Sequence, residues 1–305
     1  MAHPVVVGVD GSDGSLWAVD WAAAEADRSG LPLRLIHASL WERYEGILPR
    51  STTDRPSEQI YAENLVGSAE QRVHVLAPDV RVSTDVQPED PVAALVAAGR
   101  GAALLVVGPR GRGTVTGMLL GSVGLAVAAR AACPVVVARG AEPSRRGEYG
   151  RVVLGVGEST GSTAAAHFAF RAARARGCEL LAVRAWRSPA RENMPYPQPG
   201  GEAEAACRRR AEECLDRVVD VVVATYPEVR LERKTVHGTT HQTLLEETAE
   251  ADLLVVGAKR RHGAVGMQLG RVNHAMLHHA PCPVAVVPAG SVTEESLPDA
   301  GTPTR

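Results

Sequence analysis

The chain has 305 residues, of which 45% are hydrophobic and 22% are charged. This length is about twice that of a typical single-core domain, and the composition is that of a globular protein, so we expect two folded domains. A net charge of −2 provides no general attraction for polyanions, which argues against nucleic acid and acidic membrane surfaces as partners.

The first half alternates apolar, β-rich runs with alanine-rich or amphipathic helical stretches. The continuous apolar character of LLVVG (104–108) and CPVVV (133–137) is typical of strands covered on both faces. Strands that alternate with helices favour right-handed crossovers and a parallel sheet. We expect the five strands of this half near 4–10, 32–38, 80–86, 103–108 and 134–138.

The second half repeats this pattern. VVVGVDGSDGS (5–15) matches VVLGVGESTGS (152–162), LLVVG matches 253–257, and CPVVV matches CPVAV (282–286), in the same order. Such a repeat indicates two copies of one domain. We expect domains at 1–140 and 150–289, a linker at 141–149, a flexible tail at 290–305, and surface loops at 40–56 and 187–201.

The segment GPRGRGTVTGMLLGS (108–122) follows an apolar strand and leads into a predicted helix. In a parallel sheet, ligands bind beyond the carboxyl ends of the strands, and the free N–H groups of a helix N-terminus favour phosphate. The glycines let the backbone approach a ligand, although they also suit an ordinary surface loop. A Walker A loop is excluded because neither lysine of the chain follows a glycine, and a dinucleotide-binding fingerprint is disfavoured because the glycines follow the fourth strand and not the first.

The same segment carries a family resemblance. Gly108-x-x-Gly111, nine residues, then Gly121-Ser122 resembles the ATP-binding signature of universal stress proteins. GVDGS (8–12) and LIHA (35–38) also resemble that family, and the similarity covers about 3–139 and 150–288. It implies an α/β fold of two tandem Rossmann-like domains, similar to adenine nucleotide α-hydrolases, each a five-stranded parallel sheet sandwiched by helices.

The resemblance implies an ATP site in the first domain, with Asp10 near the ribose or a phosphate-bound Mg²⁺ and no other metal ligand from the protein. An aspartate that makes a turn or caps a helix is the alternative for Asp10. The implied ATP-binding residues are Gly8, Val9, Asp10, Ala38, Val107, Gly108, Pro109, Arg110, Gly111, Arg112, Gly113, Thr114, Gly121, Ser122 and Val123.

The second domain departs from the signature, because Gly157, Arg260 and Arg271 replace Asp10, Gly111 and Ser122. The arginines either occlude the pocket or contact a ligand themselves. The tentative second site comprises Gly155, Ala185, Gly257, Ala258, Lys259, Arg260, Arg261, His262, Gly263, Gly270, Arg271 and Val272.

Histidines and cysteines give weaker signals. His274 and His278 have the i, i+4 spacing of a metal pair, but no carboxylate or cysteine lies in the same stretch, which favours surface histidines. Five cysteines without CxxC pairs indicate neither a zinc site nor a disulfide framework. Without a leader or a long apolar run, we expect a cytoplasmic protein.

We therefore expect an ATP-binding regulatory protein of the stress response, in which occupancy of the site changes conformation or partner contacts. The alternatives are an ATP-independent dimeric scaffold and a slow ATP hydrolase, although no catalytic base is evident beside the glycine loop. By the resemblance, the closing strands at 133–137 and 282–286 would mediate homodimerisation. The protein partner is not identified by the sequence.

Overall fold

The computed structural model describes residues 3–40, 57–110, 120–158, 161–188, 201–258 and 269–290. The chain divides into two compact units, the first containing the first repeat up to Arg139 and the second spanning Gly140–Ala289. Except for Gly290, the predicted tail lies outside the described residues. Most of each predicted surface loop lies outside them as well.

Unit 1 has the predicted five strands, all paired in parallel in the order β3-β2-β1-β4-β5. Val5 of β1 pairs with Leu33 of β2 on one side and Leu104 of β4 on the other. The elements are β1 (Val5–Gly8), α1 (Asp13–Ser29), β2 (Leu33–Ala38), α3 (Ser57–Leu76), β3 (Val82–Gln87), α4 (Pro91–Ala98), a 3-10 turn (Gly99–Gly101), β4 (Leu104–Val107), α5 (Ser122–Arg130) and β5 (Val135–Val137).

Unit 2 repeats this topology with the parallel order β10-β9-β6-β7-β8. Its repeat elements are β6 (Arg151–Gly155), α7 (Gly161–Arg176), β7 (Glu179–Trp186), α8 (Glu202–Val223), β8 (Leu231–His237), α9 (Thr240–Glu247), β9 (Leu253–Ala258), α10 (Arg271–His279) and β10 (Val284–Pro288). The two repeats of the sequence are therefore two copies of one doubly wound fold.

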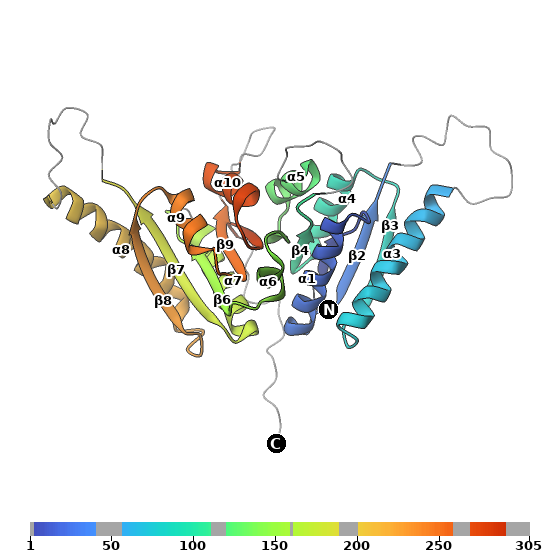
Figure 1. Cartoon of the computed structure of the whole chain (residues 1–305), viewed down its shortest axis with the longest axis horizontal. Helices are drawn as coiled ribbons and strands as arrows, with labels where there is room; N and C mark the ends of the chain where they lie inside the picture. The colour runs from blue at the N-terminus through green and yellow to red at the C-terminus, as the bar shows by residue number, and fades with distance from the viewer. Residues whose placement is uncertain are drawn as a thin grey trace, which may run out of the picture. The chain divides into compact units, whose positions relative to one another are not determined.

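Each sheet is covered by helices on both faces. In unit 1, α1 lies beside α3 on one face while α4 packs against α5, and α7 and α8 make the matching pair in unit 2 (Figure 1). Val5, Val6 and Val7 of β1 are completely buried, as their unbroken apolar run predicts. In unit 2, Phe170 of α7 is also completely buried, and its ring stacks on that of Tyr226.

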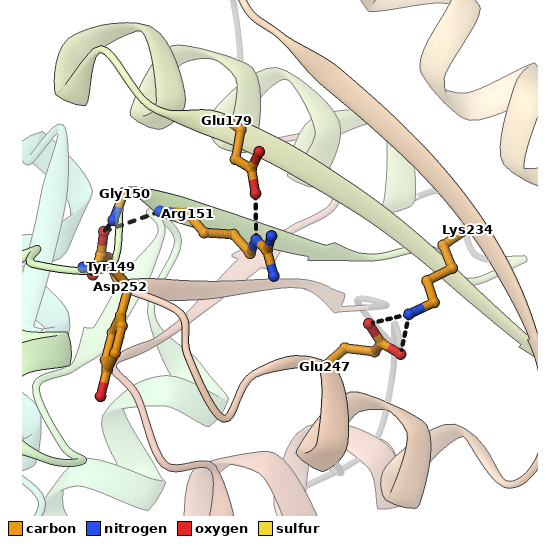
Figure 2. A network of polar contacts seen from close by, with 7 residues as sticks. All are labelled: Tyr149, Gly150, Arg151, Glu179, Lys234, Glu247 and Asp252. Carbon is orange, nitrogen blue, oxygen red and sulfur yellow. Dashed lines mark hydrogen bonds and ion pairs between the residues drawn. The ribbon is translucent and has the colours of Figure 1, made fainter.

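The junction between the repeats is more ordered than a simple linker. The predicted linker contains a short helix, α6 (Glu142–Arg146), which belongs to unit 2. Beyond it, the Asp252 carboxylate accepts hydrogen bonds from the backbone N–H groups of Tyr149, Gly150 and Arg151 at 3.0, 2.8 and 3.1 Å. Asp252 is only 2% exposed, and Figure 2 shows its carboxylate facing these three residues. This contact holds the chain where β6 begins.

Within the described part of the chain, no helix combines the length and the apolar character needed to cross a membrane.

Candidate functional site

A cavity of about 500 Å³ opens at the carboxyl edge of the unit 1 sheet. It lies where the strand order reverses, because β2 follows β1 on one side and β4 flanks it on the other. This switch point is where doubly wound sheets bind ligands. The cavity is lined by Gly8, Val9, Asp10, Ser15, Ile36, Ala38, Pro91, Leu95, Val107, Gly108, Arg110, Leu120, Gly121, Ser122, Val123 and Gly124.

Most of the residues predicted for the first site meet at this cavity. Pro109 lies in the same loop but does not line the cavity, and 111–114 fall outside the described residues. The sequence reading missed Ser15, Ile36, Pro91, Leu95, Leu120 and Gly124. Among these, Ser15 ends the DGSDGS run and had a local signal, whereas Pro91 and Leu95 reach the cavity only through the crossover that places α4.

Asp10 makes the turn that was one of the two roles weighed for it, and it also lines the cavity. Its Oδ1 atom accepts hydrogen bonds from the N–H and the hydroxyl of Ser12 at 3.0 and 2.6 Å. This contact is an Asx turn, which leads the chain from β1 into α1. Ser12 then caps α1 by accepting from the Ser15 N–H at 3.2 Å. The turn therefore holds the carboxylate at the mouth of the cavity.

Gly108 is required by packing as well as by any ligand. A Cβ atom added to Gly108 would lie 2.4 Å from the carbonyl oxygen of Gly14, and one added to Gly14 would lie 2.6 Å from the carbonyl oxygen of Arg110. Both distances are far inside van der Waals contact. The N-terminus of α1 therefore lies directly against the loop after β4, and this approach requires two glycines.

The far end of that loop presents a helix N-terminus to the cavity. Gly121 is the N-cap of α5 and has extended backbone angles, and as a glycine it has no side chain with which to cap the helix. The N–H of Gly121 donates to the carbonyl of Pro109 at 2.7 Å. The N–H groups of the first turn have no acceptor within the helix, so together with the helix dipole they favour an anion at Ser122 and Val123.

Part of the cavity lining is apolar. It includes Ile36, Pro91 and Leu95, and the Leu95 side chain lies close to β1, where a Cβ on Gly8 would come within 2.9 Å of Leu95 Cδ1. Asp90 fixes the start of α4 by accepting from the N–H groups of residues 92 and 93. The lining thus combines apolar side chains with a helix N-terminus that is suited to an anion.

Unit 2 keeps the packing glycines but changes the polar groups. A Cβ on Gly257 would lie 2.6 Å from the carbonyl oxygen of Gly161, as at the matching pair in unit 1. The N–H of Gly157, which stands in the place of Asp10, is held by the Ser162 hydroxyl at 3.2 Å. Arg271 is exposed at the first position of α10, and the predicted residues 259–263 lie outside the described part.

Comparison with known proteins accounts for both repeats. The model of the universal stress protein family matches residues 1–139 and again residues 148–288. A universal stress protein of Mycobacterium tuberculosis is 32% identical over 304 residues, covering 93% of this chain and 96% of the relative. One from Mycolicibacterium smegmatis is 31% identical over 298 residues, covering 93% and 97%. The chain belongs to the universal stress protein family.

Solved structures agree on the fold of this tandem universal stress protein. A universal stress protein from Archaeoglobus fulgidus superposes with a TM-score of 0.63 at 17% identity, covering 95% of this chain and all of that chain. A putative universal stress protein from Pseudomonas aeruginosa superposes with a TM-score of 0.58 at 14% identity, covering 94% and 93%. At these identities the likeness establishes the architecture alone.

The histidines of α10 do not form a metal cluster in the described structure. The rings of His274 and His278 stack with centroids 4.4 Å apart, so they lie face to face instead of converging on one point. Among the residues described in this universal stress protein, no group of three or more His, Cys, Asp or Glu is placed to hold a metal ion. The cysteines of the described chain are free thiols.

Proposed function

We propose that unit 1 of this universal stress protein binds Mg-ATP, and that nucleotide occupancy controls the protein's conformation or its contacts with a partner in the stress response. The observation that carries the proposal is the cavity at the switch point, which is lined both by the N-terminus of α5 and by apolar side chains. Its volume of about 500 Å³ lies within the usual range for small-ligand sites.

In the proposed complex, the base and the phosphates contact different parts of the cavity lining. The base would pack between Ile36, Pro91 and Leu95, close to the backbone of Ala38. The phosphates would meet the backbone at Gly121 and the first turn of α5. In this arrangement the side chain of Arg110, which also lines the cavity, offsets part of the phosphate charge.

Asp10 suits a magnesium ion that arrives with the nucleotide. Mg²⁺ is usually held by one or two carboxylates together with the phosphates of its substrate, and not by a complete protein cage. Asp10 is the one carboxylate among the described residues that line the cavity. The ion would neutralise phosphate charge, while the Asx turn with Ser12 keeps the carboxylate in place.

Calorimetric titration with Mg-ATP tests the proposal, using the chain's own second repeat as the source of the variants. Ser122→Arg copies Arg271 into unit 1, where it places a large side chain at the N-terminus of α5 beside the cavity. Arg271→Ser makes the reverse change in unit 2. Both positions are exposed at the start of a nine-residue helix, so both variants should fold.

We expect Ser122→Arg to weaken the unit 1 site at least about tenfold, which is about 1.4 kcal/mol. Arg271→Ser should leave the affinity of that site unchanged. Equal binding by Ser122→Arg and the wild type would place the nucleotide elsewhere. If the wild type neither binds ATP nor gains thermal stability from excess ATP, the proposal is wrong and the ATP-independent scaffold takes its place.

The regulatory part needs a separate measurement. Hydrogen exchange with and without Mg-ATP should show increased protection around α5 and the loop that precedes it, and no comparable change in the Ser122→Arg variant. A nucleotide that binds without changing exchange beyond its contacts would argue against control by occupancy. We also propose the homodimer expected for the closing strands, which the mass in solution, measured by light scattering, would test directly.

A further inference from the structure

The pairing of β1 with β2 ends in an unusual way beside the cavity. The two strands pair from Val5↔Leu33 to Gly8↔Ile36, and the Val9 N–H continues the ladder to the Ile36 carbonyl at 2.8 Å. In a parallel ladder, the next two bonds would join the Ala38 N–H to the Val9 carbonyl and the Gly11 N–H to the Ala38 carbonyl.

Side chains take both of these ladder positions. His37 Nδ1 lies 2.7 Å from the Val9 carbonyl oxygen, and the Gly11 N–H donates to the Ser15 hydroxyl at 3.1 Å. Among the hydrogen bonds of the described residues, the Ala38 N–H and carbonyl therefore have no partner on the β1 side. Ala38 lines the cavity, so a donor and an acceptor of one residue are left at its wall.

The geometry also defines the state of the His37 ring. A carbonyl oxygen only accepts hydrogen bonds, so Nδ1 must carry the proton in this contact. His37 is 8% exposed, and its side chain lies on the face of β2 opposite to those of Ile36 and Ala38, because successive side chains of a strand alternate. His37 therefore acts on the cavity through the backbone and has no contact with its interior.

Unit 2 has the same hydrogen bond to the carbonyl after its first strand, but a different side chain donates it. The Val156 N–H bonds to the Val183 carbonyl at 2.9 Å, as at Val9 and Ile36. The Val156 carbonyl then accepts from Arg184 Nη1 at 3.1 Å, and Arg184 stands at the position of His37 in the repeat. Both repeats place a side-chain donor on this carbonyl, so what they share is the hydrogen bond and not the imidazole.

We propose that His37 is a positioning residue for the base of the nucleotide. By occupying the Val9 carbonyl it keeps the N–H and carbonyl of Ala38 open, and these two groups pair with the edge of a heterocycle that carries a neighbouring acceptor and donor. Buried backbone groups need such partners, which makes the open strand edge a recognition element. This inference rests on the proposed binding of ATP in unit 1.

The test compares His37→Phe, which keeps a ring without a donor, with His37→Arg, which supplies the donor used at Arg184. Each is titrated with Mg-ATP and with magnesium tripolyphosphate, which has the phosphates but no base. His37→Phe should weaken ATP binding about tenfold, from the loss of one or two hydrogen bonds, and leave the tripolyphosphate affinity unchanged. His37→Arg should restore most of the ATP affinity.

A second measurement follows the Ala38 amide by NMR hydrogen exchange in the nucleotide-free protein. This amide should exchange rapidly in the wild type and become protected in His37→Phe, because the Val9 carbonyl is then free to accept it. The inference would be overturned if the exchange rate of the Ala38 amide were the same in His37→Phe and the wild type. It would also be overturned if the two proteins bound ATP equally, or if His37→Phe lost affinity for ATP and tripolyphosphate in parallel. Absence of ATP binding by the wild type would instead refute the proposed function on which it rests.

Discussion

Replacing Gly108 by alanine separates packing from ligand binding at the glycine loop. The added Cβ would lie 2.4 Å from the oxygen and 2.5 Å from the carbon of the Gly14 carbonyl, and 2.9 Å from the Ser15 nitrogen. All three are backbone atoms at the start of α1, which is held by the Ser12 cap and by its buried face. The clash amounts to about 1 Å of overlap, which side-chain rotation does not relieve.

We expect Gly108→Ala to destabilise unit 1 by about 3 kcal/mol, at the upper end of the range for overpacking. For a unit of this size, that loss lowers the melting temperature by about 10 °C. Differential scanning calorimetry without nucleotide measures the effect directly. Because no ligand is present to stabilise the folded protein, any shift in the melting temperature reports a change in packing.

Two matched glycines serve as controls for this experiment. Gly257→Ala should lower the transition of unit 2 similarly, because its Cβ would lie 2.6 Å from the Gly161 oxygen. Gly101→Ala should leave the melting temperature within about 2 °C of the wild-type value, since no atom lies within 4 Å of its added Cβ. A wild-type transition in Gly108→Ala would refute the packing argument and leave ligand approach as the reason for this glycine.

Three further predictions concern the rest of the chain. Asp252→Asn removes a buried carboxylate from three N–H donors and should cost unit 2 about 2–4 kcal/mol in urea unfolding, against less than about 1 kcal/mol for Asp220→Asn in an exposed ion pair. Burial raises the pKa of Cys133 to about 11, so iodoacetamide at pH 8 should label it only after unfolding, whereas the half-buried Cys207 should react in the native protein. Phe170→Ala should cost about 3–5 kcal/mol by leaving a cavity in the unit 2 core, measured by the same unfolding. Labelling of Cys133 in the native protein would contradict the argument from burial. Equal losses of stability for the two aspartate variants would contradict the role given to Asp252, and a loss below about 1 kcal/mol for Phe170→Ala would contradict its role in the core.

The sequence alone predicted the doubling of the fold and the positions of its strands. Unbroken apolar runs such as LLVVG identify buried parallel strands, and their recurrence in the same order identifies the repeat. The N-terminus of α5 at Gly121 and Ser122 was also predicted correctly. These features are local, because the residues that define them are neighbours in the chain.

The linker shows where local reasoning was incomplete. Proline, glycine and charge at 141–149 predicted a linker, but they did not indicate the short helix that forms there or the contact of Asp252 with the residues that follow it. Asp252 stands about one hundred positions further along the chain. No local pattern marks a carboxylate as the partner of so distant a backbone segment.

The residues that line the cavity divide in the same way. The glycine loop can be recognised from the sequence because its residues form one continuous segment. Pro91 and Leu95, by contrast, line the cavity only because the crossover after β3 brings α4 to the switch point. The reason for Gly108 is likewise its contact with Gly14, 94 positions away. Sequence specifies which residues are present and where strands and helices begin, because those depend on nearest neighbours. Only the tertiary structure decides which backbone atoms lie too close for a side chain and which, as at Ala38, are left open at the wall of a cavity.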